Sequence, residues 1–200
     1  MRNSIIFLAI ISSYLACEVI MYKLLQTERK IQIRANFSVI LVLIYGFTIC
    51  LKVILFKSDI SIYEAAIIGV FLFQALCDWN NQYIYSIFFE LVIIINMIII
   101  CFSFNKFNLQ ICLILAATIL VISLSNKLLK LFGRGDEMSY IVMAMIFFIK
   151  TPDVFFQKFL IALIVSLVLF LIVNIKKYIK KEKNKFPMIP EIAFSFILFI

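Results

Sequence analysis

Long apolar runs alternate with short polar or charged breaks along almost the whole chain. The breaks contain charged residues, Asn, Gly or Pro, which commonly bound helices, and most runs approach the roughly 20 residues that a helix needs to cross a bilayer. The pattern predicts an all-α fold, a polytopic transmembrane helix bundle with about eight membrane segments. The predicted segments cover residues 3–24, 37–57, 61–77, 83–104, 108–126, 137–150, 153–175 and 188–200.

The composition agrees with a protein that lives in lipid. Hydrophobic residues make up 65% of the chain, the mean hydropathy is +1.13, and the 200 residues include only four Gly and three Pro. One soluble core could not hide so much apolar surface. Without a repeat or a linker, the chain is predicted to be a single membrane-embedded domain, residues 1–200, with two N-terminal helices in 1–57 and a six-segment core in 58–200.

The distribution of basic residues predicts the orientation. The net charge is +8, but the Lys and Arg side chains gather in the breaks between apolar runs, which is typical of membrane topology and not of nucleic-acid binding. If residues 25–36 are cytoplasmic, alternation places 78–82, 127–136 and 176–187 on the same side. With Lys23, at the cytoplasmic end of the first predicted segment, thirteen of the nineteen Lys and Arg residues lie on that side. We therefore expect a multi-pass protein of the cell (inner, cytoplasmic) membrane with its N-terminus outside, with the lipid bilayer and no nucleic acid as partner.

Cysteine usage argues against a metal site. The chain has no His, and its five Cys residues show no CxxC spacing, so neither a metal nor another cofactor is predicted. We interpret the thiols as small hydrophobic groups inside a helix bundle. They are Cys17, Cys50, Cys77, Cys101 and Cys112.

Two aspartates are the strongest candidates for chemistry. Asp78 closes the third predicted segment, and Asp136 follows Gly133-Arg134-Gly135 at the start of the sixth. Counting crossings places both on the cytoplasmic side. Two carboxyl groups held close share a proton, so that one can activate water while the other protonates a carbonyl oxygen. Gly133 and Gly135 allow a sharp turn and a close approach of another chain segment. Asp136 is also a plausible helix N-cap, but the second aspartate on the same side favours catalysis over capping.

The other acidic residues have simpler interpretations. Those in the breaks, Asp59, Asp153 and Glu182, are solvated. Those in or near helices are expected to make interhelical hydrogen bonds, and Glu90 is the one kept as a further functional candidate. This second group consists of Glu18, Glu64, Glu90 and Glu191.

These elements resemble the prepilin peptidase (type IV leader peptidase) family, which belongs to the Gly-x-Gly-Asp intramembrane aspartic proteases. The first element is Asp78-Trp79-Asn80-Asn81-Gln82-Tyr83-Ile84, and the second, Gly133-Arg134-Gly135-Asp136, follows at a separation of 136 − 78 = 58 residues. Phe186-Pro187-Met188-Ile189-Pro190 is similar to the proline-containing start of the family's last helix. The resemblance covers most of the chain.

The resemblance implies an aspartic endopeptidase. Asp78 and Asp136 would be the catalytic pair, with Gly133 and Gly135 in the active-site loop, and the substrates would be type IV pilin-like or pseudopilin precursors whose basic leader is cut at the cytoplasmic membrane face. Larger members carry a cytoplasmic insert with paired CxxC motifs and also methylate the new amino terminus. Here residues 25–36 contain no Cys, so this is a short form and methyltransferase activity is not expected.

The chain departs from the family at two positions. Tyr85 stands where the family has Pro, and Met138 stands where it has Lys. Alternative interpretations are therefore a catalytically degenerate relative, or a non-enzymatic polytopic membrane protein, such as a small transporter or a scaffold subunit, whose acidic residues bind a cation or cap helices.

Overall fold

A computed structural model describes residue 6 and residues 8–16, 60–81, 84–129, 133–179 and 188–200, and this part of the chain is helical without strands. The predicted all-α fold is thereby confirmed. Residues 8–16 form one helix. The other α-helices are α3 (Ile62–Asn81), α4 (Ser86–Phe102), α5 (Leu109–Leu129), α6 (Arg134–Lys150), α7 (Phe155–Ile179) and α8 (Ile189–Phe199), with 3-10 turns at Phe104–Lys106 and Pro152–Val154.

The helix bounds differ from the predicted ones where the candidate acids lie. α3 continues to Asn81 and α6 begins at Arg134, so both aspartates lie within helical turns and not at the outer edge of a segment. The predicted segment 37–57, and residues 17–24 of the first, lie outside the described residues.

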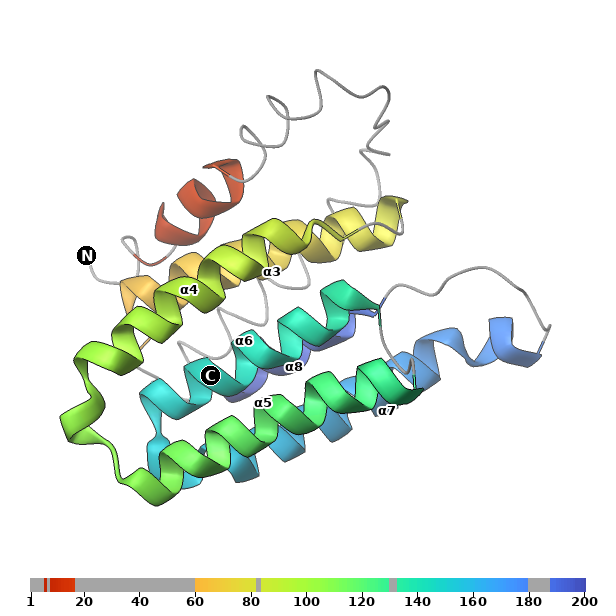
Figure 1. Ribbon diagram of the computed structural model, residues 1–200. Helices are drawn as coiled ribbons and strands as arrows, with labels where there is room; N and C mark the ends of the chain where they lie inside the picture. The colour runs from red at the N-terminus through yellow and green to blue at the C-terminus, as the bar shows by residue number, and fades with distance from the viewer. Residues whose placement is uncertain (1–5, 7, 17–59, 82–83, 130–132, 180–187) are drawn as a thin grey trace.

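The helices run side by side in three layers (Figure 1). α6 and α8 form the middle layer, between the α3 and α4 pair and the α5 and α7 pair. α8 packs against α3, α6 and α7, while α6 also packs against α4, α5 and α7. The ring of Phe196 on α8 joins the layers, since its centroid lies 4.6 Å from that of Phe71 on α3 and 6.0 Å from that of Phe147 on α6.

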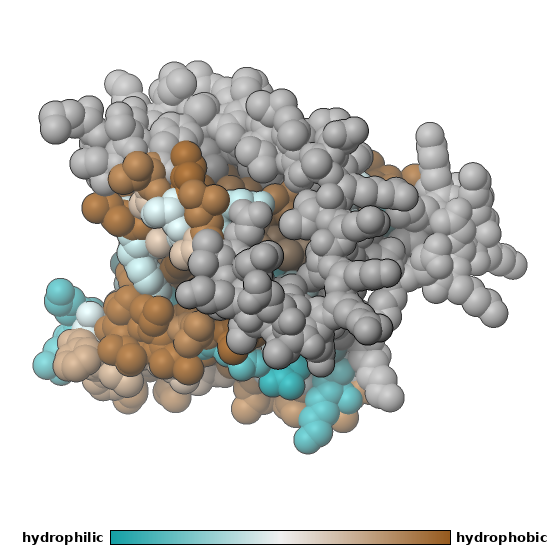
Figure 2. Space-filling model, turned by 90° about the horizontal axis from the view of Figure 1, so that it is seen from above, coloured by the Kyte–Doolittle hydropathy of each residue, from teal (hydrophilic) through white to brown (hydrophobic). Residues whose placement is uncertain are grey.

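Three of the described helices are long and apolar enough to cross a membrane, over Ile62–Trp79, Leu109–Leu128 and Pro152–Ile175. The second and third of these expose large apolar side chains along their outer faces, and Figure 2 shows broad hydrophobic areas on the visible described surface. Such extensive exposed apolar surface is costly in water. The structure is therefore compatible with a membrane protein. Exposed examples are Leu113, Leu120, Leu171 and Ile172.

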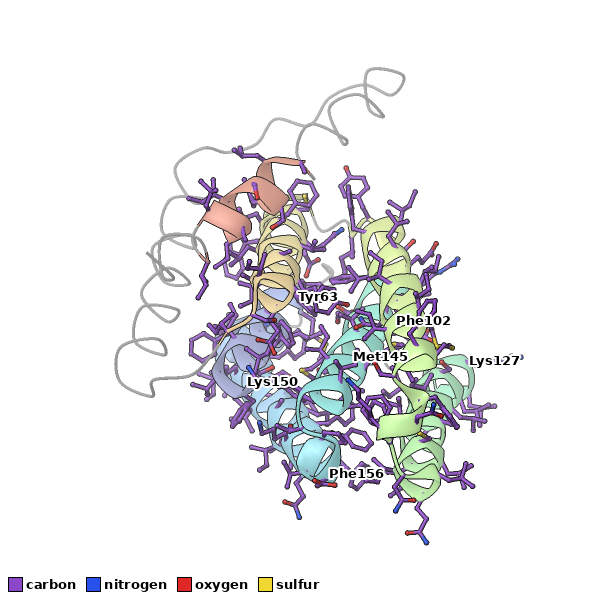
Figure 3. All side chains as sticks on the ribbon, turned by 90° about the vertical axis from the view of Figure 1, so that its left-hand side faces the viewer. Tyr63, Phe102, Lys127, Met145, Lys150 and Phe156 are labelled. Atoms are coloured by element: carbon purple, nitrogen blue, oxygen red, sulfur yellow. The ribbon has the colours of Figure 1, made fainter. Side chains whose placement is uncertain are left out.

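An end-on view shows how α6 fills the centre (Figure 3). Met145 on α6 is completely buried, whereas Phe102 at the end of α4 is 90% exposed. At this end of the bundle, Lys150 Nζ of α6 lies 3.0 Å from the Glu64 carboxylate of α3. The interhelical bond expected for Glu64 is thereby confirmed, and the pair ties the middle layer to α3.

Candidate active site

The opposite end of the bundle brings the candidate residues together. α3 and α5 end there, and α4, α6 and α8 begin there (Figure 1). Asp78 lies in the last turn of α3 and Asp136 in the first turn of α6. α8 packs against both of these helices, and its N-terminus lies against the side chain of Asp78.

Asp78 is held by the start of α8. Its side chain is buried, with 5% exposure, and its Oδ2 accepts hydrogen bonds from the backbone N–H groups of Met188 at 2.8 Å and Ile189 at 3.0 Å. The first N–H groups of a helix have no acceptor within the helix and carry a partial positive charge. Asp78 therefore caps a helix more than a hundred residues further along the chain, and that helix in turn stabilises negative charge on Asp78.

Asp136 is held by its own turn. Gly133 is the N-cap of α6, and its N–H donates to Asp136 Oδ2 at 3.1 Å. The expectation that Asp136 itself is the N-cap is wrong, because the helix begins two residues earlier and places this carboxylate at the third helical position. Asp136 Oδ1 is buried and has no hydrogen-bond partner among the described residues. One oxygen is thus committed to the turn while the other is available to a ligand.

The two carboxyl groups are close enough to influence each other. Asp136 lies outside the three apolar spans, and its pKa is raised from 3.8 to about 7. Burial is the main cause and the negative charge of Asp78 adds to it, while the hydrogen bond from Gly133 acts in the opposite direction. The structure therefore brings the sequence-predicted acids together as two buried, electrostatically interacting groups at one end of the bundle.

Gly135 permits the contact between the two motif elements. A methyl group on Gly135 would lie 2.3 Å from Cγ2 of Ile84 and 2.6 Å from its Cβ, far inside van der Waals distance. Gly133 has more room, because its nearest neighbour in the same test is Asp136 Oδ2 at 3.2 Å, and its φ of −68° suits any residue. The glycine requirement at 135 is consequently a matter of space, since Ile84 packs directly on the backbone that carries Asp136.

Sequence reasoning missed Gln74, one helical turn before Asp78. Its side chain is completely buried; Nε2 donates to the carbonyl oxygen of Tyr85 at 2.8 Å, and Oε1 accepts from the Tyr85 N–H at 3.0 Å. Proline at position 85 would lack this N–H, so Tyr85 in place of the expected Pro is matched by a bond that Pro could not make. A polar amide among apolar residues of α3 was the available signal.

Two polar contacts flank the turn before α6. Arg134 donates to Glu90 of α4 at 3.1 Å, and Asn126 of α5 donates to Glu137 at 2.6 Å. The interhelical bond expected for Glu90 is thereby confirmed. Met138, which stands where the resemblance leads us to expect Lys, is half-buried against the apolar core. The turn that carries Asp136 is thus connected to both neighbouring helices.

Within the described ranges, no group of three or more His, Cys, Asp or Glu side chains is placed to hold a metal ion. No protein-family model, curated protein or solved structure matches the chain. The arrangement offers two buried carboxyl groups, one with an oxygen without a partner in the described structure, and these can take part in proton transfer.

Proposed function

We propose that this chain is a membrane aspartic endopeptidase in which Asp78 and Asp136 activate water. The observation that carries the proposal is the pairing of two buried carboxyl groups from α3 and α6, with interacting charges and with Asp136 Oδ1 available beside them. Burying two carboxyl groups that share negative charge costs free energy, and ionisable groups with strongly shifted pKa values cluster at functional sites. Peptide hydrolysis by two acids that share a proton is a function that requires such a pair.

The hydrogen bonds support different roles for the two acids. Two N–H groups at the start of α8 hold negative charge on Asp78, so Asp78 acts as the base that removes a proton from water as its oxygen attacks the scissile carbonyl carbon. Asp136, whose pKa is raised to about 7, carries the proton and donates it to the carbonyl oxygen. The resulting gem-diol then collapses; the peptide C–N bond breaks as the nitrogen takes the proton that Asp78 had accepted, and a diol hydroxyl returns its proton to Asp136.

The proposed substrates follow from the resemblance to prepilin peptidases. They are type IV pilin-like or pseudopilin precursors, cut after the basic leader where their apolar helix meets the cytoplasmic membrane face. In this proposal the chain has about eight membrane segments in the cell membrane and its N-terminus outside, as the positive-inside bias indicates. It cleaves without methylating, and the dyad mechanism needs no metal or cofactor.

Coexpression with a pilin-like precursor tests the proposal. Asp78→Asn and Asp136→Asn keep an oxygen that can accept the capping N–H bonds but remove the acid, so both proteins should accumulate while the precursor stays uncut. Asp153→Asn, at an exposed acid in the turn before α7, is the matched control and should cleave normally. Precursor cleavage by either the Asp78→Asn or the Asp136→Asn variant would refute the assignment.

The hydrogen bonds themselves favour a second candidate function. Oδ2 of Asp78 accepts two backbone N–H groups at the start of α8, and Oδ2 of Asp136 accepts the N–H of the N-cap Gly133 of its own helix. Both carboxylates would then only stabilise helix starts, in a non-enzymatic membrane component or an inactive relative. In that case the Asn variants would be as stable as the parent. Only the Ala variants, which lose the oxygen that accepts these N–H groups, would lower the stability, by about 1 kcal/mol each.

A further inference from the structure

We infer that Gln74 is a positioning residue that fixes where the Asp78 and Asp136 carboxyl groups lie relative to each other. The inference rests on the proposed function and concerns a residue that does not touch the reacting atoms. Gln74 lies four residues before Asp78 on α3, so the two side chains project from the same face one turn apart. Its position therefore couples the helix that carries one acid to the segment that contacts the other.

The coupling begins with a two-point attachment. Gln74 both donates to and accepts from the backbone of Tyr85, at 2.8 and 3.0 Å, which fixes the direction of the chain as well as its distance. Tyr85 is the N-cap of α4, and its own side chain makes no capping hydrogen bond. Because the side chain of Gln74 is fully buried, losing either bond would leave a desolvated polar group.

The attachment continues to Asp136 through packing. Ile84 precedes Tyr85 and lies against Gly135, where even a methyl group has no space. Gly135 precedes Asp136 in the turn whose N–H at Gly133 holds the carboxylate. A continuous path thus runs from α3 through Gln74, the backbone at 84–85 and Gly135 to the second acid, and a shift at Gln74 is transmitted because close-packed groups cannot absorb it.

Gln74→Met tests the inference, since it keeps the length of the side chain and removes both hydrogen bonds. The Tyr85 amide lies ahead of the first helical turn of α4, where amides have no helical acceptor. Hydrogen exchange of the purified protein should therefore quicken by about tenfold or more in the peptide containing Tyr85, and also in the peptide containing Gly133 to Glu137. For cleavage of a pilin-like precursor, kcat should fall by about 10- to 100-fold with KM nearly unchanged.

Two further variants make the outcome specific. Gln74→Glu keeps an acceptor for the Tyr85 N–H and should give intermediate exchange and intermediate kcat. Gln157→Met makes the same change at an exposed site on α7 and should match the parent in every assay. If Gln74→Met prevents accumulation of the protein, the exchange rates and kcat of Gln74→Glu are compared with those of the parent instead.

The exchange measurement separates this inference from the proposed function. Faster exchange in both peptides in a protein that cleaves no precursor would support the path and refute the peptidase. Faster exchange at Tyr85 alone, with no change at residues 133–137 and an unchanged kcat, would show that Gln74 merely stabilises the start of α4 and would overturn the inference. Unchanged exchange at Tyr85 would overturn it as well.

Discussion

Replacement of Gly135 by Ala should damage the site through steric displacement. A methyl group there would lie 2.3 Å from Ile84 Cγ2 and 2.6 Å from Ile84 Cβ, and ordinary contact begins at 3.4 Å. Rotation of the Ile84 side chain can move Cγ2 but not Cβ, so one of the two segments must move by about 3.4 − 2.6 = 0.8 Å. A misplacement of about 1 Å costs roughly 10²-fold in rate. We therefore expect precursor cleavage to slow by about 100-fold, although Ala by itself is the better helix former by up to about 1 kcal/mol.

Gly133→Ala is the matched control within the same turn. Its methyl group would lie 3.2 Å from Asp136 Oδ2, a deficit of 3.4 − 3.2 = 0.2 Å, and it should cleave within about threefold of the parent. The assay is the initial rate of cleavage, with thermal unfolding of each purified variant as a check of folding. Ile84→Ala added to Gly135→Ala removes two of the three closest atoms and should restore part of the rate. Equal rates for the two single Ala variants would refute the steric reasoning.

Three further outcomes are expected. Because the pKa of Asp136 is raised from 3.8 to about 7, its contribution to stability is greatest below 3.8 and is lost as pH rises toward 7; the melting temperature should fall over this range in the parent and less in Asp136→Asn. Glu64→Gln removes the negative charge that pairs with Lys150 at 3.0 Å and should destabilise the protein by up to about 3 kcal/mol, as thermal unfolding would show, with cleavage unchanged at permissive temperature. Gly69→Val places a side chain where even a methyl group would overlap Ser13 Oγ and the carbonyl oxygen of Ile10, so proteolysis should release the N-terminal helix more readily than in Ala66→Val, at a half-buried neighbouring site.

The described helices, and the choice of Asp78 and Asp136 as candidate residues, could be predicted from the sequence because both depend on local signals. Apolar runs of membrane length define most segments, and the acids stand out because charge near a bilayer is costly. The short segment before Lys150 was predicted to begin at residue 137, three residues after the actual start of α6. The Gly-rich turn looked like a break, whereas Gly133 is an N-cap and the turn is already helical at Arg134.

The contacts that fix the acids could not be predicted from the sequence. Asp78 binds the N–H groups of Met188 and Ile189, and this pairing depends on how α8 docks between α3 and α6. Gln74 is flanked by apolar residues on α3, and its partner is a backbone whose position depends on the turn after α3. Local patterns identify groups that need partners, but tertiary packing decides which partners they find.

Cleavage by the purified protein tests the central claim most directly. In lipid discs with a purified pilin-like precursor, the parent should release the leader, and Asp78→Asn and Asp136→Asn should each be slower by about 10³-fold or more while unfolding at a similar temperature. An equal mixture of the two variants should stay inactive, because both carboxyl groups belong to one chain. Leader release by either single variant, or no release by the parent, would contradict the account.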